Sequence, residues 1–266
     1  SKLKIRLPDS VPPMVSSSFE SLIPVIITLV LVCSINYCFT LTSFGNIHAL
    51  VNEIIQKPLL LIGTGLPALL ISQGLAQLLW FFGLHGDQIV GSVMDPILQT
   101  AGMENLSAYT AGDAVPYIIT DQFRALFVMI AFMSLVIAIL IVSKSNRLKG
   151  VGKVAVLPAT FCISEPVVFG APVVMNAMLF IPWVLSRPVF GLITWLFMKF
   201  GLCPYPTGVA IPWTTPPVLS GFLATNSIMG AVVQIICLAI GVLMFIPFVK
   251  MIDKTYHQEE IKTKEQ

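Results

Sequence analysis

Five long apolar segments determine the kind of fold open to this chain of 266 residues. They cover residues 21–41, 58–84, 125–143, 177–200 and 226–249. About 20 apolar residues in a helix cross the hydrocarbon core of a bilayer, so each segment is long enough to span it. Hydrophobic residues make up 56% of the chain and charged residues only 11%, which excludes an ordinary soluble domain. The sequence predicts an all-α polytopic membrane protein with about five transmembrane helices.

Basic residues after the third and the fifth apolar segments predict how the chain is oriented. The connection 144–153 contains four Lys and Arg residues and the segment 251–266 contains three, whereas residues 58–123 contain none. Because Lys and Arg gather on the cytoplasmic side of membrane proteins, we expect the connection 144–153 and a tail over 251–266 to be cytoplasmic. The acidic connection 87–123 is then expected outside.

The start of the chain carries two polar stretches. Residues 1–20 are polar and contain several prolines, and they are expected to lie at the membrane face before the first span. Residues 46–56 place apolar side chains at helical spacing beside polar ones, which predicts an amphipathic interfacial helix. Lys2, Lys4 and Arg6 favour the cytoplasmic side, whereas five crossings counted back from a cytoplasmic C-terminus place the first residue outside. Either one span is miscounted or an upstream part of the protein is missing.

Glu165 is the only charged residue between Lys153 and Arg187. An ionisable group in a membrane segment costs roughly 2.5–3.5 kcal/mol on insertion and therefore usually faces a wet cavity or the protein interior. Several prolines interrupt the same stretch, and broken backbone is tolerated in a bilayer only where protein buries it or where it lines water. The pattern predicts a re-entrant hairpin that carries a desolvated carboxylate of raised basicity near its tip. The alternative is a carboxylate that only ties hairpin amides together.

Three further residues are candidates for contact with a carbohydrate. His85 lies between two glycines, which allow close approach of a ligand or of another backbone segment. It is either a proton partner of Glu165 or an ordinary histidine of the interface. Trp213 lies among threonines and prolines, and an aromatic ring beside hydroxyl groups suits a sugar. For Trp80 and Trp213 the alternative is the aromatic belt at the membrane surface.

The sequence contains no pattern that indicates a cofactor or a metal. Its five cysteines form no C-x-x-C spacing. No phosphate-binding glycine loop, zinc motif or nucleophile elbow occurs, so the chain has no means of its own to hydrolyse ATP. We expect no cofactor, no bound metal and no nucleic-acid partner.

Several motifs follow one another along the chain. They are IRLPDSVPPMVSSSFESLIP at 5–24, WFFGLHG at 80–86, ISEPVVFGAPVVMN at 163–176, LFIPW at 179–183 and PWTTPP at 212–217. Together they resemble the membrane component IIC of the bacterial phosphoenolpyruvate-dependent sugar phosphotransferase system, in its lactose, cellobiose and chitobiose branch. The resemblance covers nearly the whole chain.

This resemblance implies a function. A IIC component binds a disaccharide such as cellobiose, chitobiose or lactose and presents its 6-hydroxyl group to a phosphocysteine on the soluble partner IIB, with IIA as a further partner. The chain would be a multi-pass sugar permease of the bacterial cell membrane and would take part in a transferase reaction only together with IIB. The resemblance implies catalytic roles for Glu165 and His85, and substrate-binding roles for Trp80, Trp213, Thr120, Ser164 and Thr214.

The chain departs from the family pattern in two ways. Ser164 stands where the family commonly has asparagine, so a hydroxyl replaces an amide and the sugar preference is in question. Relatives of this kind also carry several N-terminal spans that form a dimer interface. We therefore expect residues 1–266 to be the sugar-binding and translocation part of a longer protein that forms a homodimer. Two other functions stay open: an ion-coupled secondary sugar transporter, in which Glu165 carries a proton, and a truncated fragment that does not transport.

Overall fold

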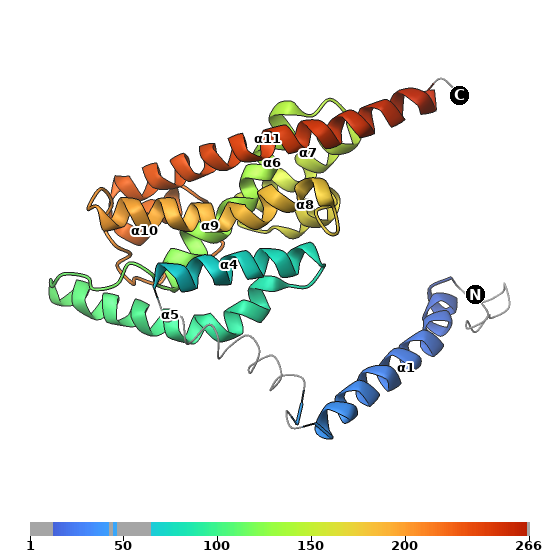
Figure 1. Ribbon diagram of the computed structural model, residues 1–266, viewed down its shortest axis with the longest axis horizontal. Helices are drawn as coiled ribbons and strands as arrows, with labels where there is room; N and C mark the ends of the chain where they lie inside the picture. Colours follow the sequence, from blue (N-terminus) through green and yellow to red (C-terminus); the bar gives the residue numbers. More distant parts are fainter. Residues whose placement is uncertain (1–12, 43–44, 47–64, 265–266) are drawn as a thin grey trace. The chain divides into compact units, whose positions relative to one another are not determined.

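The computed structural model describes residues 13–42, 45–46 and 65–264 (Figure 1). The chain divides into two compact units, Ser1–Pro58 and Leu59–Gln266. All regular structure within the described ranges is helical. Most of the amphipathic helix expected over 46–56 lies outside the described residues, as does the first part of the span expected over 58–84.

The described part of the first unit is essentially one helix, α1 (Pro13–Thr40). Its residues Leu22–Thr40 are long and apolar enough to cross a membrane, in agreement with the span expected over 21–41. The hydroxyls of Thr28 and Ser34 donate hydrogen bonds to the carbonyl oxygens four residues earlier. Since a lipid core offers no water to polar groups, this pairing within the helix suits a membrane segment.

The second unit is a bundle of helices, coloured from teal to red in Figure 1. Within it, α4 packs against α5 and α9, and α11 packs against α6, α9 and α10. The segments are α4 (Leu66–Phe81), α5 (Gly86–Ala111), η2 (Phe123–Val128), η3 (Met129–Ala131), α6 (Phe132–Val142), α7 (Asn146–Thr160), α8 (Glu165–Gly170), α9 (Ala177–Lys199), α10 (Leu219–Thr225) and α11 (Ile228–Lys264).

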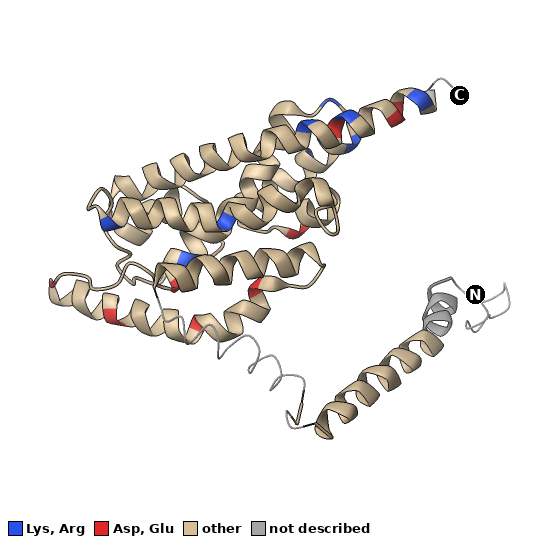
Figure 2. Cartoon of the chain, viewed as in Figure 1, with Lys and Arg blue, Asp and Glu red and all other residues tan. Residues whose placement is uncertain are grey.

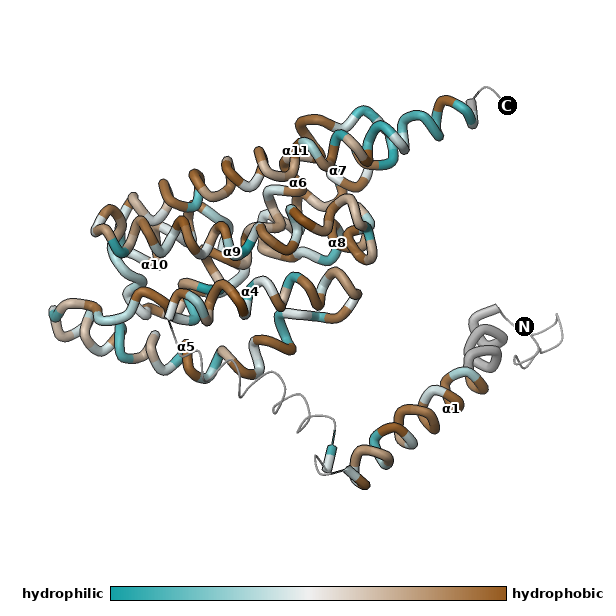
Figure 3. Tube along the Cα trace, viewed as in Figure 1, coloured by the Kyte–Doolittle hydropathy of each residue, from teal (hydrophilic) through white to brown (hydrophobic). Residues whose placement is uncertain are grey.

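Three segments of this unit are long and apolar enough to cross a membrane. They are Phe123–Val142, Ala177–Lys199 and Ile228–Thr263, and they match the last three spans expected from the sequence. The helix α4 is apolar but only 16 residues long. Figure 3 shows the hydrophobic colouring along α11 giving way to hydrophilic residues toward its C-terminal end. With α1, four candidate spans lie in the described part of the chain, and the all-α membrane class is confirmed.

Two segments that were expected as a connection and as a tail are largely helical. Most of the acidic connection 87–123 belongs to α5, which is 26 residues long and is followed by Gly112 in the left-handed conformation. Its acidic residues obscured a buried face with helical spacing, formed by Val90, Val93, Met94 and Leu98. The segment 251–266, expected as a separate tail, continues α11 as far as Lys264.

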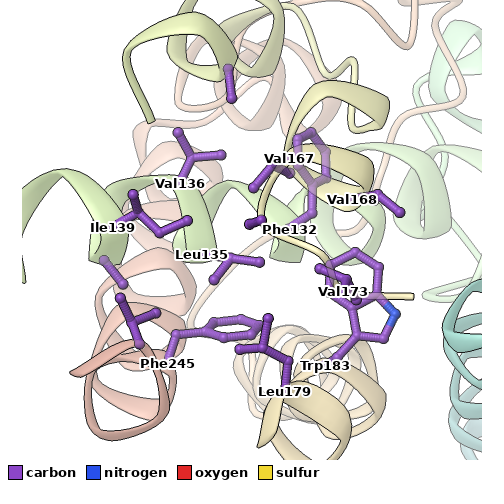
Figure 4. Packing of buried hydrophobic residues seen from close by; sticks show 14 of the residues in the cluster. Phe132, Leu135, Val136, Ile139, Val167, Val168, Val173, Leu179, Trp183 and Phe245 are labelled. Carbon is purple, nitrogen blue, oxygen red and sulfur yellow. The ribbon is translucent and has the colours of Figure 1, made fainter. Parts of the chain in front are cut away.

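The main hydrophobic core lies between α6, α8, α9 and α11 (Figure 4). Val167 and Val168 of α8 are fully buried there, among Phe132 and Leu135 of α6 and Trp183 of α9. Since lipid tails are as apolar as leucine, close packing contributes more to such a core than removal from water does. A helix as short as α8 does not persist alone, so this packing fixes the position of the residues that begin it.

Carboxylates of α11 hold the start of α7. Asp253 accepts hydrogen bonds from the amides of Lys144 and Ser145 and from the Ser145 hydroxyl, at 2.7–2.9 Å. Glu260 accepts from the amides of the next two residues. The first amides of a helix have no partner within it and favour negative charge, so these contacts stabilise the base of the α7–α8 hairpin. Basic residues gather at the same end of the unit (Figure 2).

Gln234 of α11 ties the loop before α10 to the rest of the unit. Its side chain is fully buried, and its Oε1 accepts hydrogen bonds from the amides of Val218 and Gly221 at 2.5 and 3.0 Å. Its Nε2 donates to the carbonyl of Leu126 at 2.7 Å and to the hydroxyl of Ser220 at 2.9 Å. Val218 has a φ of 77°, a strained conformation for a β-branched residue that such contacts must hold in place.

We expect Gln234→Leu to lower the free energy of unfolding by about 2–4 kcal/mol, because it leaves several buried backbone groups without a partner. Thermal unfolding of the purified chain in detergent measures the change. Ile235→Leu is the matched control, since Ile235 lies on the same helix and is 51% exposed. Equal melting temperatures for the two variants would contradict the role of Gln234.

Candidate functional site

A cavity of about 580 Å³ lies among α5, η2, the turn between α7 and α8, and the loop before α10. Its volume falls in the range of small-molecule sites, roughly 300–1,000 Å³. Apolar side chains from η2 to α6 line one part of it. The charged residues that line it are Asp87, Asp95, Asp121, Arg124, Glu165 and Arg187.

Glu165 begins α8 and therefore lies at the turn of the α7–α8 hairpin. Just before it, Cys162 has a φ of 63°, and this left-handed residue reverses the chain at the tip. The Glu165 side chain lines the cavity and is 48% exposed, so it is more open than the desolvated carboxylate that the sequence pattern predicted. The amides of Val167 and Val168 that follow it bond to the Ser164 carbonyl and not to its carboxylate, which argues against a purely structural carboxylate.

His85 faces Glu165 across the cavity. Its Nε2 lies 3.9 Å from the Glu165 Oε1, and its side chain is 45% exposed. Its Nδ1 accepts a hydrogen bond from the Gln88 amide at 3.3 Å, so His85 is the N-cap of α5. Since one ring nitrogen is occupied as an acceptor, the neutral imidazole carries its proton on Nε2, the atom that faces the carboxylate. The sequence brought these two residues together as candidates, and the structure places them in contact range.

Trp80 lies beneath His85 and does not line the cavity. It is 3% exposed, and its ring centroid lies 4.4 Å from that of His85. Its Nε1 donates a hydrogen bond to the Asp87 Oδ2 at 2.9 Å. Arg187 of α9 donates to both oxygens of the same carboxylate, with a distance of 3.0 Å from Nη2 to Oδ2. Trp80, Asp87 and Arg187 thus form a buried network that fixes the start of α5 and with it His85.

The close approach of α5 to α4 requires glycine at position 86. A Cβ atom on Gly86 would lie 1.9 Å from the carbonyl oxygen of Ala76. Of the two uses proposed for the glycines beside His85, Gly86 therefore allows the approach of another backbone segment rather than of a ligand.

A second buried arginine lines the cavity from η2. Arg124 is 6% exposed and donates a hydrogen bond to Asp95 of α5, whereas its Nε and Nη1 have no partner within the described part of the chain. The segment that carries it begins with a π-helical turn and a 3₁₀ turn before α6. Such departures from α-helical geometry are frequent at functional sites and are tolerated in a membrane where they line a cavity.

The remaining expected site residues divide into two groups. Ser164 and Trp213 line the cavity, and Trp213 is 57% exposed. Thr120 is fully buried, and its hydroxyl accepts a hydrogen bond at 3.2 Å from the amide of Phe123, the first residue of η2. Thr214 lies beside Trp213 but does not line the cavity.

The sequence analysis missed Asp87, Asp95, Asp121, Arg124 and Arg187. Arg187 lies inside an expected span, so the argument that singled out Glu165 applied to it equally. The acidic residues were assigned to a connection, and only the helical pattern of α5 would have placed two of them toward the protein. The helical spacing of α5 can be found in the sequence, but the sequence does not identify the partner of each charged residue.

Two carboxyl groups outside the candidate spans have shifted pKa values. Burial alone would raise the pKa of Asp87, but the charge and hydrogen bonds of Arg187 outweigh it and lower the pKa to about 2. Burial raises the pKa of Asp121, since its amide hydrogen bonds and the charge of Arg124 do not compensate in full. Asp87 is therefore a permanent anion near neutral pH.

Comparison with known proteins identifies the family. The family model described as "Phosphotransferase system, EIIC" matches residues 1–186. The chain is 45% identical to the oligo-beta-mannoside-specific EIIC component of Bacillus subtilis (strain 168), over 95% of this chain and 58% of that protein. The solved structure of ChbC, the IIC component of an N,N'-diacetylchitobiose-specific phosphotransferase system, is similar with a TM-score of 0.73 and 37% identity, over 97% of this chain and 61% of that one.

A more distant relative is the lactose-specific EIICB component of Staphylococcus epidermidis, with 30% identity over 99% of this chain and 46% of that protein. The chain belongs to the family of EIIC components of the phosphotransferase system and is a multi-pass membrane protein. It spans about three fifths or less of the length of these relatives. The resemblance stated from its motifs is confirmed.

We expect Arg187→Met to destabilise the protein by about 3–5 kcal/mol, because it leaves Asp87 buried without its cation. The double variant Asp87→Asn/Arg187→Met should recover a large part of this loss, since it removes both charges. Thermal unfolding of both single variants and of the double variant at neutral pH measures the coupling free energy of the pair. Additive losses from the two substitutions would show that the pair is not coupled.

Proposed function

We propose that this chain forms the sugar-binding part of a phosphotransferase permease, which binds a β-linked disaccharide and presents its 6-hydroxyl group for phosphorylation by a soluble IIB component. The observation that carries the proposal is the 3.9 Å separation of His85 Nε2 and Glu165 Oε1 in a cavity of sugar-binding size. The names of its relatives, an oligo-beta-mannoside component and a diacetylchitobiose component, support a β-linked sugar as the substrate.

The separation of the pair suits a hydroxyl group held between its members. At 3.9 Å the two atoms are too far apart for a hydrogen bond with each other. A sugar hydroxyl between them accepts a hydrogen bond from His85 Nε2 and donates its proton to Glu165. Its oxygen then attacks the phosphorus of the phosphocysteine, the sulfur–phosphorus bond breaks, and the cysteine leaves as a thiolate. Glu165 is the proton acceptor and His85 orients the nucleophile.

The other expected site residues have supporting parts in this proposal. Trp213 and Ser164, which line the cavity, contact the sugar directly: the ring packs on an apolar sugar face and the hydroxyl makes hydrogen bonds. Trp80 acts through His85 and Asp87. Thr120 accepts a hydrogen bond from the Phe123 amide and so positions η2, which lines the cavity. The substrate-binding role expected for Thr214 stays a prediction.

We further propose that the start of α7 and the end of α11 face the cytoplasm. Lys and Arg residues gather at this end of the unit, as the positive-inside rule requires (Figure 2). A soluble IIB component, with IIA behind it, would approach from that side. The homodimer expected from the family resemblance stays a prediction.

We expect Glu165→Gln to lower sugar phosphorylation by roughly 10²–10⁴-fold, the usual contribution of a positioned general base. Sugar binding should persist, since the amide keeps the shape and an acceptor oxygen. The assay measures phosphorylated disaccharide formed in vesicles supplied with phosphorylated IIB as the phosphoryl donor, next to calorimetric binding. Normal phosphorylation by this variant would refute the role of Glu165, and uptake that needs a membrane potential but no phosphoenolpyruvate would favour an ion-coupled transporter.

Two substitutions of His85 separate its structural role as the N-cap of α5 from the role proposed for its Nε2–H group in the reaction. The side-chain oxygen of an asparagine would lie near the present Nδ1 position, so we expect His85→Asn to keep the melting temperature while phosphorylation falls by at least about 10²-fold. His85→Ala should lose activity and also about 1 kcal/mol of stability with the cap. If His85→Asn phosphorylated sugar at the normal rate, the imidazole would have no part in the reaction.

A further inference from the structure

A second cavity of about 570 Å³ adjoins the first. It lies between α5 and the loop before α10. The residues that line both cavities are Gln99, Asp121, Gln122, Ile211 and Pro212. Because the two cavities have these residues in common, they lie next to each other on either side of this set.

The shared residues carry the groups that bind hydroxyls. Asp121 supplies a carboxylate and Gln99 an amide on the exposed side of α5. Gln122 is 5% exposed and donates a hydrogen bond to the Val209 carbonyl, while its Oε1 has no partner among the described residues. A sugar ring needs both donors and acceptors around its hydroxyls, and a carboxylate with two amides provides both.

Small residues leave space beside the Asp121 carboxylate. A Cβ atom on Gly102 would lie 2.4 Å from the Asp121 Oδ1, so the carboxylate rests against bare backbone of α5. Gly208 and Ala210 form the facing wall. Gly208 has a φ of 81°, and a Cβ there would lie 2.2 Å from the Gly102 carbonyl oxygen, which holds the loop close to the helix. The second cavity thus combines the polar groups of Gln99, Asp121 and Gln122 with apolar walls that include Met103 and Ile211.

The second cavity lies apart from the reacting pair. His85, Ser164 and Glu165 line the first cavity and not the second. If the 6-hydroxyl of a sugar lies between His85 and Glu165, further rings of the same sugar extend away from this pair, toward Asp121. Trp213 lines the first cavity and not the second, so stacking of a sugar ring on its side chain is confined to the first.

We propose that the second cavity binds the third ring of a β-linked oligosaccharide, and that Asp121, Gln122 and Gln99 bind hydroxyls where the second ring meets the third. The permease then selects oligosaccharides of three rings over disaccharides. This proposal rests on the function proposed above, because it takes the phosphorylated ring to lie at Glu165.

Calorimetry on the full chain in detergent tests the proposal with β-1,4-linked disaccharides and trisaccharides of glucose and of mannose. For at least one of the two sugars, the trisaccharide should bind about tenfold more tightly than the disaccharide. Ala210→Leu fills the second cavity only, and Ala210 is exposed, so the fold should tolerate the larger side chain. It should remove most of the advantage of the trisaccharide. Gln99→Ala removes an amide without filling space and should reduce the same advantage about threefold.

Val154→Ala is the matched control, since Val154 is 71% exposed on α7 and lines neither cavity. It should leave the ratio of the two affinities unchanged. Disaccharide binding without any trisaccharide advantage would overturn the proposal and leave the proposed function standing. An advantage that survives both Ala210→Leu and Gln99→Ala would overturn it as well. If none of the sugars bound, the proposed function would fail together with it.

Discussion

The pairing of Arg187 with Asp87 is the interaction on which the site depends. An arginine on a helix that can cross a membrane is costly unless it is paired, and its partner must come from another segment. Asp87 supplies that partner and thereby draws the first turn of α5 against α9. The same turn begins with His85, whose ring packs on Trp80, and Trp80 donates to the same carboxylate. The position of the imidazole thus follows from the need to neutralise one buried cation.

The hairpin on the other side of the cavity is positioned by different forces. Its base is held by Asp253, which accepts hydrogen bonds from the two amides just before α7, and by Glu260, which accepts from the first two amides of α7. Its far end is held by Val167 and Val168, which pack into the core between α6 and α9. Between these two attachments the chain reverses at Cys162, and the residues that follow face the cavity. Polar contacts at one end and packing at the other hold the turn in place without help from the Glu165 side chain.

The sequence predicted the membrane class, four spans and the hairpin of Glu165, because each depends on a local pattern of hydrophobicity or on proline. It also brought His85 and Glu165 together through the family motifs. It did not predict α5, because acidic residues along that segment resembled an exposed connection. Nor did it find Asp95 and Arg124, since the partner of a charge is set by tertiary packing. Trp80 shows the same limit: the motif identified it as important, but only the packing shows that it supports His85 and does not line the cavity.

The carboxylates around the cavity differ in how many cations and hydrogen-bond donors of the protein bind them. This difference decides which of them can accept a proton. Asp87 is bound by Arg187 and Trp80, which lower its pKa to about 2, so it is a poor proton acceptor. Asp95 is bound by Arg124. Glu165 has no such cation among the described residues: its neighbour is an imidazole at 3.9 Å, and nearly half of its side chain is exposed. A base must have a free lone pair within reach of the proton that it takes, and among the carboxylates near His85 only Glu165 meets that condition. The arginines neutralise Asp87 and Asp95, and Glu165 is the carboxylate beside His85 that we propose accepts the proton of a bound hydroxyl group.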